Sequence, residues 1–141
     1  EELFSATKTE FKHLEYYYFH NFLYGHVWKN NHRRYTERLN LIDLMHKFGH
    51  DYKVIIVGDA AMSPYEVTMS GGASDHWNDE PGSTWLTRLM NTYPKLVWVN
   101  PVPEQYWHYT QSTQMIHEIL GNKRMYPLTL KGLESAMKAL L

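Results

Sequence analysis

The stretch V-I-I-V-G-D-A-A-M-S-P at residues 54–64 decides the fold class of this chain. Its first four residues, 54–57, are β-branched and apolar, which is typical of a short strand buried on both faces of a parallel sheet. The run stops at Gly58 and Asp59, so a carboxylate stands at the exit of what looks like the most buried strand in the chain. The presence of this charge at that point needs a physical reason.

A second run of the same kind, L-V-W-V at 96–99, also ends in a polar residue, Asn100. Strand signals occur in three further places: at 14–20, where aromatic residues dominate, at 25–29 after a turn glycine, and at 124–127. We expect 14–20 to be a strand of the main sheet and 25–29 to be an antiparallel edge strand.

Apolar residues at helical spacing predict the helices that connect these strands. The predicted helices span residues 37–48, 64–68, 85–93, 109–120 and 130–140. The first has Thr36 as its N-cap and Gly49 as its stop, and Thr129 caps the last. Strands that alternate with helices predict an α/β fold: a doubly wound, mostly parallel sheet with one antiparallel edge strand, covered on both faces. We expect all 141 residues to belong to one domain.

The composition excludes several classes of protein. Fourteen Lys and Arg residues stand against 15 Asp and Glu residues, so the chain has no electrostatic footprint for nucleic acid or for an anionic membrane. It contains no cysteine, which excludes disulfides and thiolate metal sites and fits a cytosolic protein. No apolar run approaches the roughly 20 residues of a membrane span. We therefore expect a cytoplasmic protein without a nucleic-acid or membrane partner.

Asp59 and Asn100 follow the two apolar runs, and the carboxyl ends of parallel strands form the edge where α/β sheets bind ligands. A carboxylate there suits a hard cation such as Mg²⁺, whose preferred ligands are carboxylates, hydroxyls and water. The alternative role for Asp59 is to cap the helix that follows. The nine histidines do not predict a zinc site, because Gly49 interrupts the helical spacing of His46 and His50.

Five segments of the sequence, taken together, resemble a known family of domains. They are E-Y-Y-Y-F-H-N, D-Y-K-V-I-I-V-G-D-A-A-M-S-P-Y-E, H-W-N-D-E-P-G-S-T-W-L, Y-P-K-L-V-W-V-N-P-V-P and M-Y-P-L-T-L-K-G-L. They resemble the bacterial CoxE-like branch of the von Willebrand factor A-type (VWA) domains, along nearly the whole chain from about Phe4. The resemblance implies a doubly wound, Rossmann-like sheet with a metal-ion-dependent adhesion site. That site consists of a D-x-S-x-S run after the first strand, a threonine from a second loop and an aspartate after the fourth strand.

The resemblance assigns Asp59 to the last of these metal-binding positions. Thr36 matches the threonine in one register, whereas another register places the position at Leu41, which cannot bind a metal. No D-x-S-x-S run occurs in the chain. The resemblance therefore implies that the first strand and its metal-binding loop lie before Glu1, so that this chain is the C-terminal part of the domain. On its own it is then expected to bind Mg²⁺ weakly or not at all.

The function that the resemblance implies is protein interaction rather than catalysis. Such domains hold Mg²⁺ with an open position for a carboxylate of a partner protein, and bacterial relatives act with MoxR-type AAA+ ATPases in the assembly or maturation of larger enzymes. Asp59 and Thr36 would bind the metal, and Ser63 and Asn100 would contact the partner.

Two other functions remain open. One is a Mg²⁺-dependent phosphatase of the haloacid dehalogenase type, in which a late strand also ends in V-G-D. That class requires a second acid where Ser63 stands and an upstream D-x-D run, and the chain has neither. The other is a metal-free structural scaffold.

Overall fold

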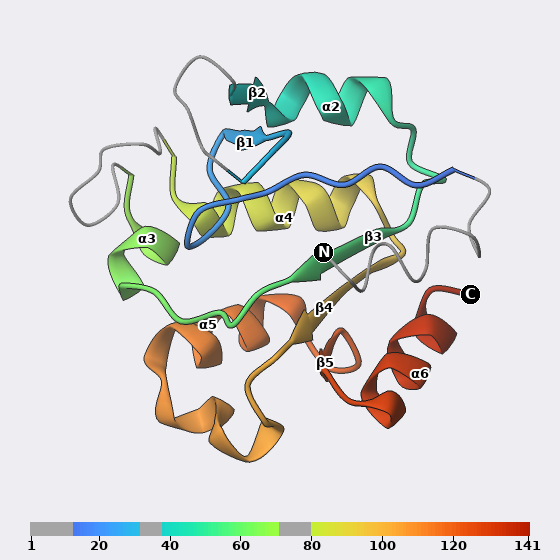
Figure 1. The fold of residues 1–141 in the computed structure, drawn as a ribbon. Coiled ribbons are helices and arrows are strands. Elements are labelled where there is room, and N and C mark those ends of the chain that lie inside the picture. The colour runs from blue at the N-terminus through green and yellow to red at the C-terminus, as the bar shows by residue number, and fades with distance from the viewer. Residues whose placement is uncertain (1–12, 32–37, 71–79) are drawn as a thin grey trace.

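A three-stranded parallel sheet lies at the centre of the chain in the computed structural model, which describes residues 13–31, 38–70 and 80–141 (Figure 1). Its strands are β3 (Val54–Val57), β4 (Leu96–Asn100) and β5 (Met125–Pro127), in the order β3-β4-β5. In the register of the sheet, Ile56 lies opposite Trp98, and Trp98 lies opposite Met125. The protein is therefore of the α/β class, and the two apolar runs of the sequence are parallel strands, as predicted. The structure shows that they are neighbours in the sheet.

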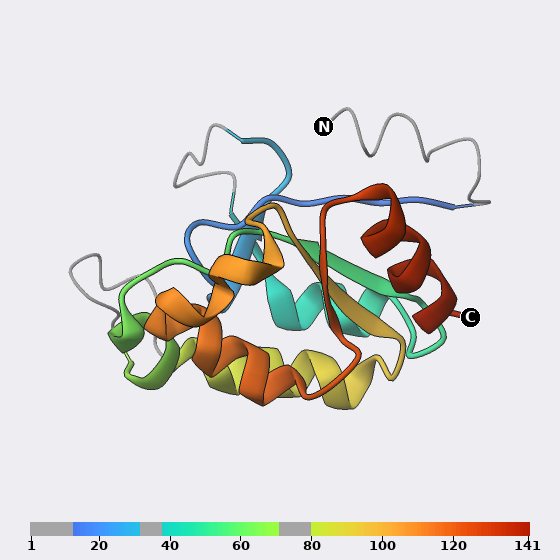
Figure 2. The ribbon, with the colours of Figure 1, turned by 90° about the horizontal axis from the view of Figure 1, so that it is seen from below.

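Helices cover both faces of this sheet, because the side chains of β4 alternate between two apolar clusters. Val97 and Val99 pack with Ala136 of helix α6 (Leu130–Ala139) and with Leu140, the C-cap of that helix. Trp98 belongs to the larger cluster on the opposite face. That cluster also contains side chains of α4 (Gly82–Thr92) and α5 (Gln111–Leu120). Figure 2 shows α6, in red, on one side of the sheet, and α4 and α5, in yellow and orange, on the other.

The first aromatic segment, 14–20, is not a strand of the main sheet, so this prediction was wrong. Among the described residues, Tyr18 forms an isolated antiparallel bridge with Trp28, through two backbone hydrogen bonds of 2.8 and 2.9 Å. The side chains pack instead: the ring centroid of Phe19 lies 6.3 Å from that of Trp98, and the centroid of Tyr17 lies 6.4 Å from that of Phe48. The aromatic content predicted a paired strand, whereas the aromatic side chains of this segment pack against the core.

The predicted antiparallel strand at 25–29 exists, but it belongs to a separate sheet. It is β1 (His26–Trp28), which pairs antiparallel with β2 (Arg38–Asn40). The predicted start of the next helix was wrong for this reason, since residues 38–40 are taken up by β2. Helix α2 spans Leu41–Lys47, and its N-cap is Asn40 rather than Thr36.

The other helices lie close to where apolar spacing placed them. Helix α3 is Pro64–Thr68, and a short 3-10 helix, η2 (Glu104–Tyr109), precedes α5. The N-cap of α6 agrees with the sequence, and α5 ends at a glycine. Gly121 follows α5 with φ of 81°, and Thr129 accepts a hydrogen bond from the Gly132 N–H at 2.9 Å.

Strand β3 is an edge strand among the described residues, which corrects the expectation that it is buried on both faces. Ile56 is buried, but Val54, Ile55 and Val57 are only half-buried, whereas all five residues of β4 are buried. The N–H groups of Val54 and Gly58 bond to the carbonyls of Lys95 and Val99 in the β4 segment. Because backbone groups alternate in direction along a strand, those of Ile55 and Val57 point away from β4.

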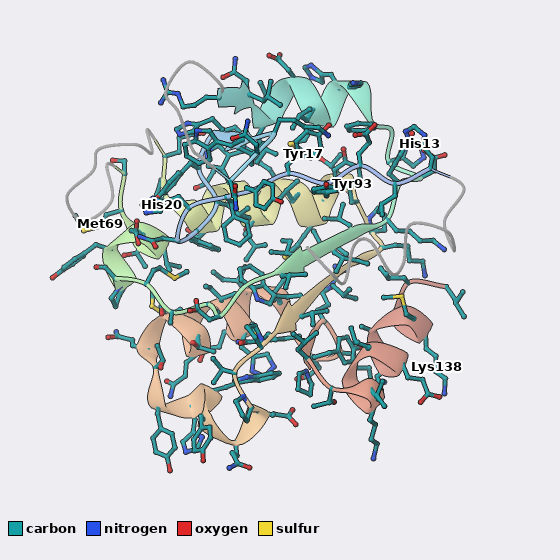
Figure 3. The ribbon with its side chains drawn as sticks, in the orientation of Figure 1. His13, Tyr17, His20, Met69, Tyr93 and Lys138 are labelled. Atoms are coloured by element: carbon teal, nitrogen blue, oxygen red, sulfur yellow. The ribbon has the colours of Figure 1, made fainter. Side chains whose placement is uncertain are left out.

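Tyr93, after α4, links the core to the end of α2: its hydroxyl donates to the Phe48 carbonyl at 2.8 Å (Figure 3). Burial raises the pKa of the Tyr93 hydroxyl above its usual value near 10. The folded state therefore favours the neutral phenol. The resulting stability is present below about pH 10, where an unfolded tyrosine ionises, and is lost as the pH rises through the folded-state pKa.

Tyr93→Phe is expected to lower the free energy of unfolding by about 1 kcal/mol at pH 7, because the hydrogen bond is lost. This deficit should shrink as the pH rises above about 10, since only the wild-type residue can ionise. Urea unfolding from pH 7 to 11 measures both effects, and Tyr109→Phe, at a 74% exposed position, is the control. A deficit that stays constant across this range would contradict the role given to burial.

Candidate functional site at the carboxyl edge of the sheet

The carboxyl ends of β3 and β4 form one edge, which we call the crest and define as residues 58–63 and 100–103. Asp59 is exposed there. Its Oδ1 atom accepts a hydrogen bond from the Ala61 N–H at 2.9 Å, so the carboxylate closes a local turn. Asp59 does not cap α3, because Ser63 holds that position and accepts from the Tyr65 N–H at 3.3 Å. The carboxylate is thus oriented by its own loop and faces solvent.

The loop after Asp59 is fixed by hydroxyl groups from the first turn of α5. Ala60 is buried in the left-handed region, with φ of 59°, a conformation that costs a non-glycine residue on the order of 1 kcal/mol. Its carbonyl accepts hydrogen bonds from Ser112 Oγ at 2.8 Å and Thr113 Oγ1 at 3.0 Å. Ser112 Oγ also accepts from the Met62 N–H at 3.1 Å. These contacts hold the unusual backbone that presents Asp59.

Asn100 joins the two loops of the crest from inside. Its side chain is fully buried. The Nδ2 atom donates to the Asp59 carbonyl at 3.2 Å, and Oδ1 accepts from the Val102 N–H at 2.9 Å. The polar residue at the end of the second apolar run therefore positions the crest, and its side chain presents no surface to a partner in this conformation.

The structure brings three of the four predicted site residues together, namely Asp59, Ser63 and Asn100. Thr36 lies outside the described residues. Within residues 13–31, 38–70 and 80–141, no group of three or more His, Asp or Glu side chains is arranged to hold a metal ion. Asp59 is the exposed carboxylate of the crest, with Ser63 half-buried beside the start of α3.

A buried carboxylate in α3, the helix that follows the first loop of the crest, was not predicted from the sequence. Glu66 of α3 is only 5% exposed, and its Oε1 atom accepts from the Tyr24 hydroxyl at 2.9 Å and from Asn21 Nδ2 at 3.5 Å. His20 Nδ1 lies 3.1 Å from the same hydroxyl, and Figure 3 places His20 on the side of α3. This network ties the 20–24 turn to the helix that follows the crest. P-Y-E in the sequence gives no sign that its glutamate is internal.

Two ion pairs that lower the pKa of a carboxyl group lie outside the crest. Arg88, in the middle of α4, forms a bidentate pair with Glu80, which precedes the helix. One contact is 2.9 Å, and this pairing lowers the pKa of the Glu80 carboxyl. Lys29 lies 3.0 Å from Glu15 and lowers the pKa of that carboxyl in the same way. The side chains of both pairs are 35–55% exposed, so solvent screens the charges and their contribution to stability is small.

Comparison of the chain with protein-family models, with curated proteins and with solved structures finds no match. The class that the fold defines is an α/β protein with a three-stranded parallel sheet and a separate antiparallel pair of strands. In the part of the chain that the structure describes, no helix is long and apolar enough to cross a membrane.

Proposed function

We propose that this chain is part of a VWA-like module that binds a protein partner through a Mg²⁺ ion. The observation that carries the proposal is the exposed carboxylate of Asp59, on a rigid crest at the carboxyl end of a parallel strand. A fixed carboxylate that faces solvent can bind a hard cation and leave coordination positions open for water or for a carboxylate of the partner. A binding role fits this arrangement better than catalysis, since the crest holds no second acid or base beside Asp59 among its described residues.

Thr36 and Ser63 are the hydroxyl residues that we propose for the same region, Thr36 as a metal ligand and Ser63 as a contact residue. Ser63 already accepts the capping hydrogen bond of α3, so its hydroxyl proton is the group it can offer to a partner. The class of partner that we propose is a cytoplasmic MoxR-type AAA+ ATPase that acts in the assembly or maturation of a larger enzyme.

The outer edge of β3 supports the finer fold assignment. Its backbone groups at Ile55 and Val57 point away from β4, and no strand among the described residues pairs with them. A further parallel strand at this edge would complete a doubly wound sheet and would place its own carboxyl end beside Asp59. We propose that this strand carries the D-x-S-x-S run, which supplies the second carboxylate and two hydroxyls of the metal site.

Magnesium titration tests the proposal. The 141-residue chain is expected to bind Mg²⁺ no tighter than the millimolar range, because one crest carboxylate is too small a ligand set. A longer chain that also supplies the proposed strand with its D-x-S-x-S run should bind at least about tenfold tighter, and Asp59→Asn should remove that gain. Isothermal titration calorimetry measures both.

Asp51→Asn is the matched control, because Asp51 is exposed near the opposite, amino end of β3. It should leave Mg²⁺ binding unchanged. Tight, stoichiometric binding by the 141-residue chain alone, or equal losses for both variants, would argue against a metal site completed by an added strand.

A further inference from the structure

Residues 13–20 run alongside the outer edge of β3 without pairing with it. Figure 1 and Figure 2 both show this segment, in blue, beside β3, in green. The two run in the same direction, because His20 ends the segment on the side of α3, toward which β3 also points (Figure 3). The strand pairings of the described residues include none between this segment and β3. Each has its pairing partner on the far side, β1 for residues 13–20 and β4 for β3.

Backbone groups of the two segments point toward each other. Successive backbone groups alternate in direction along an extended chain. The Tyr18 N–H and carbonyl both bond to β1, so those of Tyr17 and Phe19 point the opposite way, toward β3. The groups of Ile55 and Val57 point away from β4, and therefore toward residues 13–20. We call Tyr17, Phe19, Ile55 and Val57 the strand site, because their backbone donors and acceptors form two facing rows.

The contacts of Phe19 indicate that the two rows are too far apart to bond directly. A Cβ atom at Gly58 would lie 3.0 Å from Cζ of Phe19, which is the far end of the ring. The same ring packs against Trp98 of β4. The backbone of residue 19 is therefore about one aromatic side chain away from the β3 segment, whereas paired strands lie about 4.8 Å apart. This separation suits one inserted strand, with that spacing on each side.

The side chains around the strand site are apolar on both faces of the sheet. Ile55 and Val57 pack with the α6 cluster but are only half-buried, since α6 lies against β4 and β5. On the opposite face, Tyr17 and Phe19 pack against the larger cluster and are also half-buried. A strand between them would have apolar neighbours on both faces, so its sequence should be a continuous apolar run rather than an alternating one.

We propose that the strand site receives the added strand between residues 13–20 and β3, so that the two separate sheets become one. The strand lies parallel to β3 and bonds to Ile55 and Val57 on one side and to Tyr17 and Phe19 on the other. The joined sheet has the order β2, β1, residues 13–20, added strand, β3, β4, β5. This proposal rests on the proposed function only in that the same protein supplies the strand, because pairing on both sides needs no metal ion.

Amide hydrogen exchange tests the two facing rows in the 141-residue chain. The four amides of the strand site should have protection factors at least about tenfold lower than that of Trp98, whose N–H bonds to the Arg124 carbonyl within the sheet. Strong protection of Tyr17 and Phe19 would overturn the proposal, because their N–H groups would already have partners. Protection of all four that increases with protein concentration would also overturn it and would assign the site to a second copy of the chain.

The same measurement on the longer chain that supplies the strand, in the presence of EDTA, tests the insertion itself. All four amides should gain at least about tenfold protection. A gain at Ile55 and Val57 alone would place the strand at a simple edge and overturn the proposal, as would no gain at any of the four. A gain at all four without tighter Mg²⁺ binding would support this proposal and contradict the proposed metal site, so the two can fail separately.

Tyr17→Pro and Tyr17→Ala form a matched pair of variants, because both remove the ring and only proline removes the backbone N–H. In the longer chain, Tyr17→Pro should unfold at a lower urea concentration than Tyr17→Ala, since the N–H that bonds to the added strand is lost. In the 141-residue chain the two variants should differ less. An equal difference in both chains would contradict pairing at Tyr17.

Discussion

Gly132→Ala is expected to lower the free energy of unfolding by about 3 kcal/mol or more, because the first turn of α6 has no room for a methyl group. A Cβ atom at this position would lie 2.0 Å from the Pro127 carbonyl oxygen and 2.9 Å from its carbonyl carbon. Both neighbours are backbone atoms of β5, which cannot turn aside as a flexible side chain can. The clash must be relieved by moving α6 away from the strand.

Such a movement would disturb contacts well beyond residue 132. The Gly132 N–H would leave its hydrogen bond with Thr129, and Ala136 would withdraw from Val97 and Val99. Urea unfolding measures the loss, with Lys131→Ala as the control, because Lys131 is the exposed neighbour in the same turn. The control should stay within about 0.5 kcal/mol of the wild type. Equal stability of the two variants would show that α6 does not lie this close to β5.

Asn100→Leu is expected to cost about 2–4 kcal/mol and to loosen the crest. Leucine has a similar size but cannot form hydrogen bonds, so the Asp59 carbonyl and the Val102 N–H each lose a partner inside the protein. Burial of the added apolar group offsets only part of this loss. The local effect should be as clear as the global one: hydrogen exchange at the Val102 amide is expected to become faster than in the wild type.

The control is Asn91→Leu, since Asn91 is exposed on α4. It should change stability by no more than about 0.5 kcal/mol. Asn100→Asp adds a further comparison, because it keeps the acceptor for the Val102 N–H but loses the donor to Asp59 and buries a charge. If Asn100→Leu left both the stability and the exchange of the Val102 amide unchanged, the amide would not be the link between the two crest loops.

The elements that the sequence predicted well are those whose signal is local. The runs at 54–57 and 96–99 identify their strands, and the cap at Thr129 marks where the last helix begins. A run of β-branched residues or a capping hydroxyl favours one backbone conformation regardless of its distant neighbours.

The errors concern pairing between distant segments. Residues 14–20 have strong strand preference, but preference does not select a partner, and among the described residues Tyr18 forms an isolated bridge with Trp28. Strand β2 shows the opposite error, because a strand forms where the sequence predicted none. Arg-Leu-Asn at 38–40 carries no strand pattern, yet it pairs with β1 residue by residue. Strand formation depends on tertiary context more than helix formation does, and β2 has too few residues for a periodic pattern.

The candidate site follows the same rule as the fold: its local features were predictable from the sequence, and its contacts between distant segments were not. Asp59 could be placed at an exposed edge because it follows a buried run, and the structure has it exposed there. The burial of Asn100 and the hydroxyl contacts of Ser112 and Thr113 could not be predicted, since they depend on α5 lying under the loop. For the same reason, nothing local distinguishes the internal carboxylate of Glu66 from a surface one.

The outer edge of β3, which no strand of the described residues pairs with, also has an expected consequence in solution. Natural edge strands are protected by lysine, proline, a bulge or a covering loop, but the four residues of β3 are Val, Ile, Ile and Val. Such a segment combines high strand propensity with no charge, which are the features of aggregation-prone stretches. The charged residues next to this strand are Lys53 and Asp59, which are both exposed, and we expect their charges to oppose association of strand edges. Asp59, the residue proposed to bind the metal, is thereby also expected to protect the edge.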